Sequence, residues 1–294
     1  MIINNNYIVS RDYENTRIDK WIKQNINNFP QSYIEKILRK KKIKVNNLKV
    51  SSSYTLKIKD KINVRLNFEL HKNDNKYKYT PTNKDIQNLK KKIIFENDDY
   101  LVLSKPNDIA VQSGTKTGKN IIDVLNYQNP KHFIVHRLDK DTSGVLIIAK
   151  NRYTAKYLSE QFLLRKIKKK YLALINGKIK QDNGLIKSRI TNKNKKILGI
   201  LKFKTLKKNK LFSLIKIDLV TGRKHQIRKQ FKELGHPLVG DKIYSKKENR
   251  PLMLHSYEIE FVINKKSVKH KIGIPGYFNN FINSINFETD LKNF

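Results

Sequence analysis

The residues best suited to chemistry lie in one short polar segment, from His136 to Gly144, which contains acids, bases and two hydroxyls. Within it, Asp139 could act as a nucleophile or as a base, as carboxylates do in covalent and general-base catalysis. An aspartate beside an arginine in a loop is also commonly a turn-capping or ion-paired residue. Residue types alone therefore leave both a catalytic and a structural role open for Asp139.

The chain on each side of this segment indicates how it is held. Residues 133–135 precede it and residues 145–149 follow it, and both runs are short, apolar and rich in β-branched side chains, which is typical of buried strands. We therefore expect Asp139 on a connection between two strands, where rigidly held loops often carry catalytic groups. We interpret Thr142, Ser143 and Gly144 as residues that shape the turn.

A cation that could oppose this acid is Arg228, in a helix predicted over residues 225–234. The periodicity separates an apolar face, expected to be buried, from a basic face. The apolar face has Ile227, Phe231 and Leu234, and the basic face has Lys224, Arg228 and Lys232. A carboxylate that becomes buried in a site needs an opposing cation, because desolvation disfavours its charged form. Arg228 could supply it, or could lie on a solvated face that contacts phosphate or nothing.

Three further residues could line a binding site, and each has a plain structural alternative. Tyr171 lies in a predicted strand, where it could fill the core or present an aromatic ring with a polar tip to a ligand. Lys105 precedes Pro106 and could simply end a strand. Thr221 suits the start of a helix, whose free N–H groups and dipole could bind a phosphate.

The overall charge points to a polyanionic partner. The 294 residues include 63 Lys and Arg against 25 Asp and Glu, which gives a formal net charge of +38 and a pI of about 10.1. Chains of this kind bind nucleic acids by releasing counterions from phosphates. An AT-rich genome would also enrich Lys, Asn and Ile together, but it accounts less well for the shortage of acids.

Composition also excludes several classes of site. The chain has no Cys, so disulfides, thiolate chemistry and Cys-based zinc sites are excluded, and the seven His residues show no close ligand spacing. We therefore expect no metal site. No apolar run approaches the roughly 18 residues that a membrane span requires, and the N-terminus does not resemble a signal peptide. We expect a soluble, cytoplasmic monomer without a membrane partner.

Composition divides the chain into three parts. Residues 1–70 contain two short amphipathic helices followed by strand-like segments. Residues 71–92 are polar and contain Pro81, so we interpret them as a linker. Residues 93–294 contain more strand-like runs than helices, which predicts an α+β domain with a large, mostly antiparallel sheet. The predicted strands of that domain include residues 100–103, 171–175, 212–219 and 257–263.

The order of the motifs resembles the RluA-type pseudouridine synthases. The segment from His136 to Gly144 matches that family's signature, in which His-Arg-Leu-Asp is followed two residues later by Thr-Ser-Gly. The other motifs that match are the Lys105-Pro106 pair and residues 169–173, 221–228 and 235–241. The chain departs from the pattern at Asp108, Gln112 and Lys224, where the family usually has Gly, His and Thr.

Residues 1–70 resemble the S4 RNA-binding module found in many of these synthases, which makes this part a small α/β domain. The basic residues expected to contact RNA there are Arg17, Arg39, Lys40, Lys41 and Lys42. Family members commonly have glycine at the positions of Lys42, Asn47 and Lys59. Asparagine tolerates a positive φ, whereas lysine does so poorly.

The resemblance implies roles for the candidate residues. In the family, the aspartate corresponding to Asp139 is catalytic, the arginine corresponding to Arg228 pairs with it, and the tyrosine corresponding to Tyr171 stacks on the uracil and assists proton removal from C5. Extrusion of the uridine from folded RNA would leave a space that Arg137 could fill. Further RNA contacts are implied at Lys105, Arg223 and Lys224.

The implied activity is isomerisation of uridine to pseudouridine in large-subunit ribosomal RNA, as in the RluC subgroup. The reaction breaks the bond from uracil N1 to the ribose and rejoins the base through C5, with no change in oxidation state, so no cofactor is expected. Two alternatives remain open: a synthase for other ribosomal RNA or tRNA sites, and a non-catalytic RNA-binding factor for ribosome assembly. The presence of Asp139, Tyr171 and Arg228 together favours an enzyme.

Overall fold

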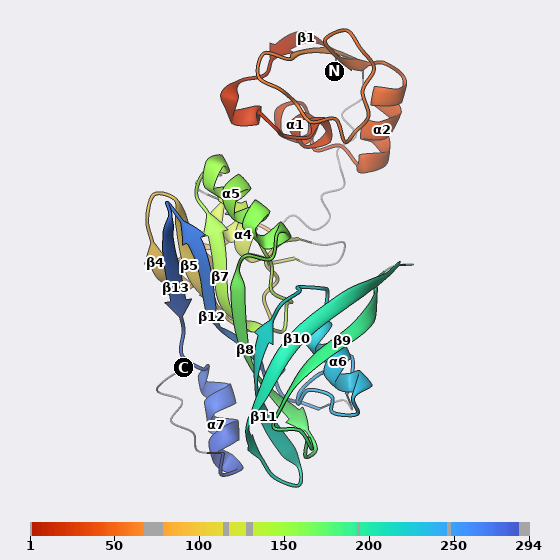
Figure 1. The fold of residues 1–294 in the computed structure, drawn as a ribbon. Coiled ribbons are helices and arrows are strands. Elements are labelled where there is room, and N and C mark those ends of the chain that lie inside the picture. The colour runs from red at the N-terminus through yellow and green to blue at the C-terminus, as the bar shows by residue number, and fades with distance from the viewer. Residues whose placement is uncertain are drawn as a thin grey trace. The chain divides into compact units, whose positions relative to one another are not determined.

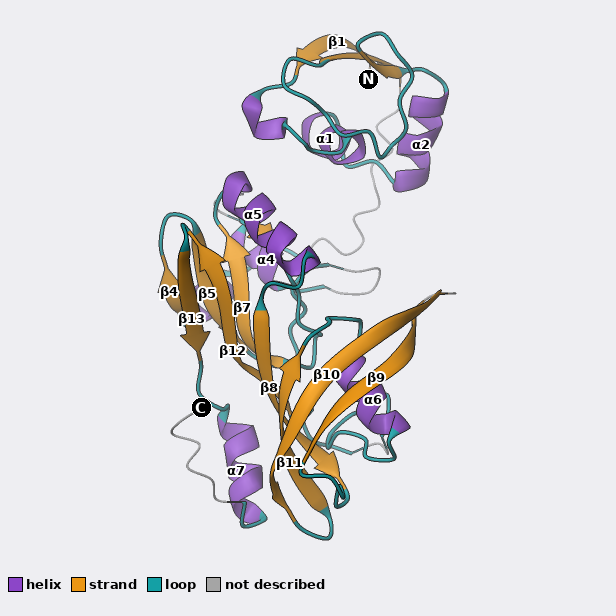
Figure 2. Cartoon of the chain, in the orientation of Figure 1, coloured by secondary structure: helices purple, strands orange, loops and turns teal. Residues whose placement is uncertain are grey.

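A computed structural model describes residues 2–67, 79–113, 118–127, 132–192, 195–245 and 248–287. The chain divides into two compact units, Met1–Lys76 and Tyr77–Phe294, which Figures 1 and 2 show. Residues 71–78 of the expected linker lie outside the described residues. In the described part, each helix is too short or too polar to cross a membrane.

The first unit has its own small core. Helices α1 (Ile18–Asn25) and α2 (Gln31–Arg39) pack on an antiparallel sheet in the order β1 (Ile2–Ile8), β3 (Lys61–Asn67), β2 (Ile43–Val45). A 3-10 turn, η1 (Arg11–Tyr13), lies between β1 and α1. The apolar positions expected at helical spacing are all buried: Ile18, Trp21, Ile22, Ile34, Ile37 and Leu38. Helical periodicity therefore identified both helices and their buried faces.

Left-handed backbone occurs in this unit close to the positions where glycine is usual. Asn47 and Lys59 have φ values of 63° and 67°. At the end of α2 the positive φ, 57°, falls on Lys41 and not on Lys42. The N–H of the next residue, Lys42, donates to the Ile37 carbonyl over 3.0 Å. This bond is the one that usually follows a left-handed glycine at the end of a helix.

The second unit is an α+β domain built on one large, mostly antiparallel sheet, as expected. The sheet path is β4-β5-β7-β12-β8-β11-β10-β9, with β13 paired to β12 and β6 paired to β7, and only the short β12–β7 pairing is parallel. Its strands are β4 (Ile93–Glu96), β5 (Tyr100–Lys105), β6 (Phe133–Ile134), β7 (Ser143–Ala149), β8 (Lys168–Asn176), β9 (Asn183–Asn192), β10 (Lys195–Lys208), β11 (Phe212–Leu219), β12 (Leu254–Ile263) and β13 (Lys266–Lys271). All four predicted strands are present.

Helices cover both faces of the sheet, which explains the near-continuous apolar run in β8. Tyr171 and Ala173 pack with residues of α6 (Gln226–Glu233). Leu172 and Leu174 point the other way and pack with Phe278 of α7 (Gly276–Ser284). Figures 1 and 2 show α6 and α7 against different parts of this sheet. Residues 171–174 are therefore buried on alternating sides of one strand.

The remaining helices include one in the segment expected to be a linker. Helix α3 (Asn83–Lys90) begins with a capping box and buries Ile86 and Leu89 beside α4 (Ile121–Leu125). Helix α5 (Arg152–Leu163) precedes β8. The interpretation of residues 71–92 as a linker is thus corrected for residues 83–90. This helix was not predicted, because two apolar residues among lysines and asparagines are too few to show a helical repeat.

The polar segment from His136 to Gly144 requires glycine at its β7 end, position 144. Gly144 has φ +134°, and a Cβ atom built on it would lie 2.3 Å from the Ser256 carbonyl oxygen. The adjacent Ser143 hydroxyl is buried, 2.9 Å from His255 Nδ1 and 3.0 Å from the Tyr277 hydroxyl. These contacts attach the end of the segment to β12 and α7, in keeping with a structural role for the serine.

Candidate active site

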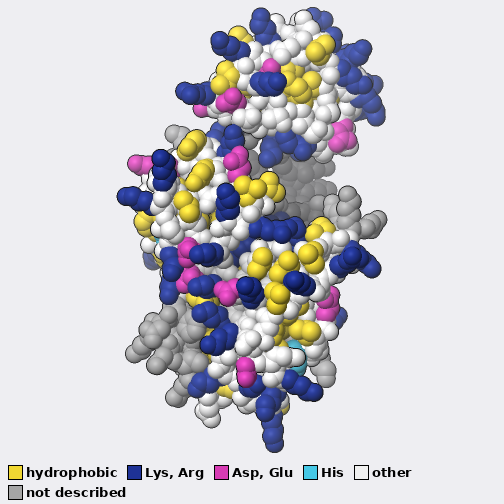
Figure 3. Space-filling model, viewed as in Figure 1, with side chains coloured by type: hydrophobic (Ala, Val, Ile, Leu, Met, Phe, Trp, Pro, Cys, Tyr) yellow, Lys and Arg dark blue, Asp and Glu magenta, His cyan; other side chains and the backbone are white. Residues whose placement is uncertain are grey.

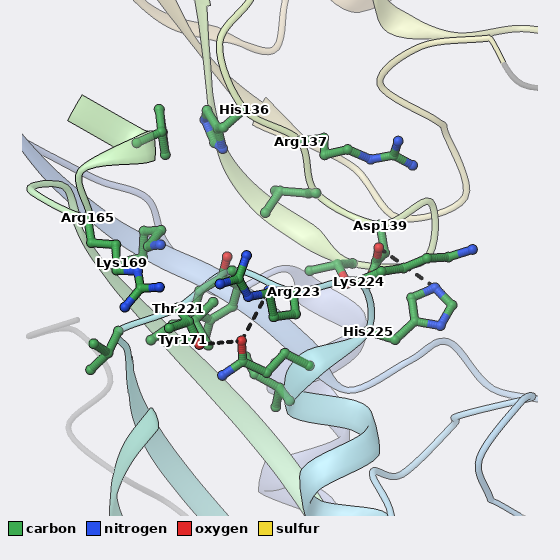
Figure 4. Close-up of a pocket in the computed structure, with 18 of the residues that line it drawn as sticks. His136, Arg137, Asp139, Arg165, Lys169, Tyr171, Thr221, Arg223, Lys224 and His225 are labelled. Atoms are coloured by element: carbon green, nitrogen blue, oxygen red, sulfur yellow. Dashed lines mark hydrogen bonds and ion pairs between the residues drawn. The ribbon is translucent and has the colours of Figure 1, made fainter. Parts of the chain in front are cut away.

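A pocket of about 720 Å³ lies between the His136–Gly144 segment, the end of α5, β8 and the turn before α6. Figure 4 shows its labelled side chains. Six of the residues expected at the site line this pocket: Arg137, Asp139, Tyr171, Arg223, Lys224 and Arg228. The fold therefore brings together residues that are up to 91 positions apart in the chain, from Arg137 to Arg228.

Asp139 lies on the connection from β6 to β7, as the flanking strands predicted. The Thr142 N–H donates to its carbonyl oxygen over 3.1 Å, which closes the turn. The carboxylate is partly open, with 23% of the side chain exposed, and its Oδ1 lies 3.7 Å from His225 Nε2. It is thus held by backbone contacts while its oxygens remain accessible from the pocket.

Lys105 is buried and binds the backbone of this loop. Its side chain is 1% exposed, and its ammonium donates to the carbonyls of Pro106 and Lys140 over 2.8 and 2.9 Å. Burial lowers the pKa of Lys105 to about 7, although Asp141 and Asp139 oppose that change. An ammonium bound to loop carbonyls and closed to solvent is not placed to contact RNA, which corrects that expectation.

Arg228 is buried and not on a solvated face. Its Nε and Nη2 donate to both oxygens of Asp241 over 2.7 and 2.6 Å, while Nη1 lies 3.9 Å from Asp141. Burial acts to lower the pKa of Arg228, but Asp241, Asp139 and Asp141 outweigh it and raise that pKa. The expected direct pair with Asp139 is thus replaced by a bidentate pair with Asp241. Leu234, expected to be buried on the same helix, is 48% exposed.

His225 occupies the place beside Asp139 that Arg228 was expected to fill. It is the N-cap residue of α6, with a left-handed backbone of φ 52° and ψ 30°. Its Nδ1 lies 3.0 Å from the Tyr244 hydroxyl. The sequence contained this histidine beside the Gln-Ile-Arg triplet, but no periodicity or spacing indicated its contact with Asp139.

The turn that carries His225 is fixed by Gln226. The Gln226 amide oxygen accepts from the Thr221 hydroxyl over 2.7 Å and from the Arg223 N–H over 3.1 Å. Its amide nitrogen donates to the Ile200 carbonyl over 3.1 Å. Helix α6 begins at Gln226, so Thr221 braces the turn and does not start the helix, contrary to our prediction.

Tyr171 forms part of the pocket wall. It lies in β8, is 7% exposed, and packs in the core below α6. Burial raises its pKa to about 12, with Ser256 opposing and Asp139 adding to the rise. The ring therefore combines both expected settings, because it belongs to the core and also lines the pocket.

Cations surround the mouth of the pocket. Arg137, Arg165, Arg223 and Lys224 line it, and Lys169 lies deeper, where burial and Arg165 lower its pKa to about 8. His136 is structural: it accepts from the Ile147 N–H over 2.9 Å and stacks on Phe162. Burial and Lys169 lower the pKa of His136 to about 3, which keeps the imidazole neutral. Arg165 was not singled out from the sequence, and Lys169 was noted only as the first residue of the motif at residues 169–173.

A partly exposed carboxylate and a buried tyrosine, in a pocket of small-ligand size with a cationic rim, suit an enzyme that acts on a nucleic acid. The comparisons agree with this class. Residues 99–233 match the family model described as RNA pseudouridylate synthase. Together with relatives more than 30% identical over most of the chain, this match shows that the chain belongs to this family, and its activity is the isomerisation of uridine to pseudouridine in RNA.

Individual relatives extend the match over most of the chain. The "Ribosomal large subunit pseudouridine synthase C" of Buchnera aphidicola subsp. Schizaphis graminum is 33% identical over 94% of this chain and 96% of that protein. The protein of the same name from Rickettsia prowazekii is 34% identical over 89% and 95%. The solved structure "Human RNA Pseudouridylate Synthase Domain Containing 1" is 26% identical, with a TM-score of 0.57 over 67% of this chain and 86% of that chain.

Proposed function

We propose that this enzyme modifies uridines of large-subunit ribosomal RNA in the cytoplasm, with Asp139, Tyr171 and Arg228 as its central residues. The observation that supports the proposal most is that Asp139 and Tyr171 line one pocket rimmed by cations. The relatives named as synthases of the large ribosomal subunit support the substrate, because they match nearly their whole length.

In the proposed mechanism, Asp139 acts on the extruded uridine, either as a nucleophile or as a base at the ribose. The N1–C1′ bond breaks, the uracil turns, C5 bonds to C1′, and the C5 proton is lost as N1 gains one. Tyr171 stacks on the base. Its raised pKa keeps the phenol protonated near neutral pH, so stacking suits it better than acting as a base.

Arg228 would act on Asp139 through its positive charge and not through a direct hydrogen bond, because the two carboxylate oxygens of Asp241 already bind its guanidinium. Arg137 is exposed at the pocket mouth, where it suits the space that an extruded nucleotide leaves in the RNA. The remaining cations of the rim would bind phosphates.

The first unit would act as an S4-like RNA-binding module. Arg39, Lys40, Lys41 and Lys42 are all exposed at the end of α2. Arg17 is exposed as well, but its guanidinium pairs with Asp19 over 2.6 Å. The four residues at the end of α2 are therefore better placed than Arg17 to contact phosphates.

The test is to map pseudouridines in the ribosomal RNA and the tRNA of cells that lack the protein. At least one uridine of the large-subunit RNA should lose its modification, wild-type protein should restore it, and Asp139→Asn should not. In single-turnover assays, Asp139→Asn should be slower by about a thousandfold or more. The matched control is Asp141→Asn in the same loop, for which we expect a loss below tenfold. Modification at the normal rate by Asp139→Asn would refute the mechanism, and sites lost only from tRNA would refute the substrate.

A further inference from the structure

We propose that His225 is a positioning residue for Asp139, held in place by Tyr244. The inference deepens the proposed function and rests on it. In this arrangement the Tyr244 hydroxyl donates to His225 Nδ1, which places the imidazole proton on Nε2, facing the carboxylate of Asp139. One carboxylate oxygen is thereby held, and the other is left to act on the nucleotide.

The backbone conformation of His225 directs its side chain to this position. Its left-handed conformation is uncommon for a residue with a Cβ atom and persists where surrounding contacts fix it. The Gln226 bonds to Thr221, Arg223 and Ile200 supply those contacts. The conformation turns the imidazole away from α6 and toward the catalytic loop, as Figure 4 shows for His225 and Asp139.

The side chain of His225 is fixed from its other edge. Its Nδ1 lies 3.0 Å from the Tyr244 hydroxyl, and the two rings meet edge-on at 5.6 Å. Tyr244 is itself anchored, because its N–H donates to Asp241 over 3.0 Å and its ring lies 5.3 Å from the Arg228 guanidinium. A continuous set of contacts thus runs from Asp241 through Tyr244 and His225 to Asp139.

The distance between His225 Nε2 and Asp139 Oδ1, 3.7 Å, is slightly too long for a hydrogen bond. Catalytic hydrogen bonds are often long in the absence of substrate and shorten once substrate excludes water. The charged groups around the imidazole are Asp139, Arg228, Lys224 and Asp241, and the titratable Tyr244 hydroxyl contacts its Nδ1. Burial lowers the pKa of His225, with Asp139 opposing and Arg228 adding to the effect. A neutral imidazole that donates from Nε2 is consistent with that direction.

The test compares His225→Asn, Tyr244→Phe and the double variant in single-turnover assays at saturating ribosomal RNA. Asparagine tolerates the left-handed backbone, so His225→Asn keeps the turn. Misplacing a reacting group can cost up to about a hundredfold in rate, so we expect kcat to fall about tenfold in each single variant, with the Kd for RNA unchanged. The double variant should be no slower than His225→Asn, because both residues act through one contact.

The pH profile separates positioning from a structural role. A hydrogen bond to a carboxylate favours its charged form. Its loss in His225→Asn should therefore move the acid limb of kcat upward, by about half to one pH unit. A substitution that merely disturbs the fold would lower kcat at all pH values without moving this limb.

A second histidine–tyrosine pair outside the pocket provides matched controls. His270 Nε2 lies 3.1 Å from the Tyr100 hydroxyl, so His270→Asn and Tyr100→Phe remove the same kind of bond. Both controls should keep the wild-type kcat and acid limb.

Three results would overturn the inference: wild-type kinetics in Tyr244→Phe, an unmoved acid limb in His225→Asn, or a loss confined to RNA affinity. If the wild-type protein forms no pseudouridine in ribosomal RNA, the proposed function fails instead, and that result is available before any variant is made.

Discussion

Lys105 and Arg228 are two buried cations near the catalytic loop, and their surroundings stabilise them in different ways. Arg228 has both oxygens of Asp241 within 2.7 Å, so its pKa is raised despite burial. Lys105 is bound by two neutral carbonyls, so burial dominates and its pKa falls to about 7. The folded protein therefore begins to release the Lys105 proton near neutral pH, while Arg228 stays charged.

This difference predicts a pH dependence of stability. An unfolded lysine has a pKa of about 10.4, so between about pH 7 and pH 10 the unfolded chain binds more protons than the folded one. The free energy of unfolding should therefore rise with pH over this window, and Lys169 should add to the rise in the same direction. Urea unfolding at pH 7 and pH 9, followed by circular dichroism, should show a smaller rise in Lys105→Met than in wild type. The exposed Lys204→Met is the control, and an unchanged rise in Lys105→Met would contradict the prediction.

The site illustrates what residue patterns can and cannot predict. Asp139 was expected on a loop between strands, because the apolar runs beside it have the length and composition of buried strands. Helical periodicity could not predict the partner of Arg228, because Asp241 lies 13 residues further along the chain, beyond the end of α6. The contact of His225 with Asp139 depends on one left-handed residue. Histidine adopts this conformation more often than most residues do, but a single histidine does not identify such a position.

At the scale of elements, the first unit has turns that suit glycine but contain other residues. Lys59 has φ 67° and its N–H donates to the Val9 carbonyl over 3.1 Å, so the tertiary contact enforces a conformation that lysine disfavours. Lys41 is also left-handed, at the end of α2, where its N–H donates to the Leu38 carbonyl over 3.0 Å within the last turn. The unit therefore contains local strain at two turns.

Lys59→Gly should stabilise the first unit. Relief of the left-handed strain gains roughly 1–2 kcal/mol, and the added freedom of glycine in the unfolded chain costs roughly 0.5–1 kcal/mol. We expect a net gain of about 0.5–1 kcal/mol. The single tryptophan of the chain, Trp21, lies in this unit, so its fluorescence during urea unfolding reports on the unit alone. Lys57→Gly, which replaces a lysine without a positive φ, should be destabilising. A loss of stability in Lys59→Gly would show that the strain is smaller than expected.

The elements of the fold were predictable where hydrophobic spacing was long and regular. The helices of the first unit and four strands of the large sheet met that condition. Helix α3 did not, because its apolar face consists of Ile86 and Leu89 alone. Strands β9 and β10 were also not predicted, although they form a long antiparallel pair. Their outward faces mix lysines with exposed leucines such as Leu185 and Leu198, so the sequence shows no clean alternation. Their inward apolar residues are buried by tertiary packing, which includes contact with α6.

At the scale of the whole molecule, the charge of +38 is spread over both units. Figure 3 shows Lys and Arg side chains across the visible face of each unit, with acidic side chains few among them. Contacts to phosphates give affinity without sequence preference. Charge in general should therefore strengthen RNA binding, whereas the pocket in the second unit should determine the chemistry.

Removal of residues 1–76 should separate these contributions. The second unit has its own cores and contains the whole pocket. We therefore expect the truncated protein to bind ribosomal RNA at least about tenfold more weakly, with a shallower dependence of log Kd on log salt concentration. Its single-turnover rate at saturating RNA should stay within about threefold of wild type, since no group that reacts is lost. Filter binding at several salt concentrations and pseudouridine formation measure the two quantities separately.

A point-variant version of this experiment distinguishes a specific RNA contact from general charge. Replacing Arg39, Lys40, Lys41 and Lys42 by glutamine removes four charges at the end of α2. The matched control removes four exposed lysines of the second unit: Lys178, Lys180, Lys265 and Lys266. Each cation that contacts a phosphate contributes about one to the salt slope, so the α2 variant should lose more slope and more affinity than the control. Equal losses in the two variants would mean that the first unit contributes only its share of the overall charge, and the S4-like assignment would then be wrong.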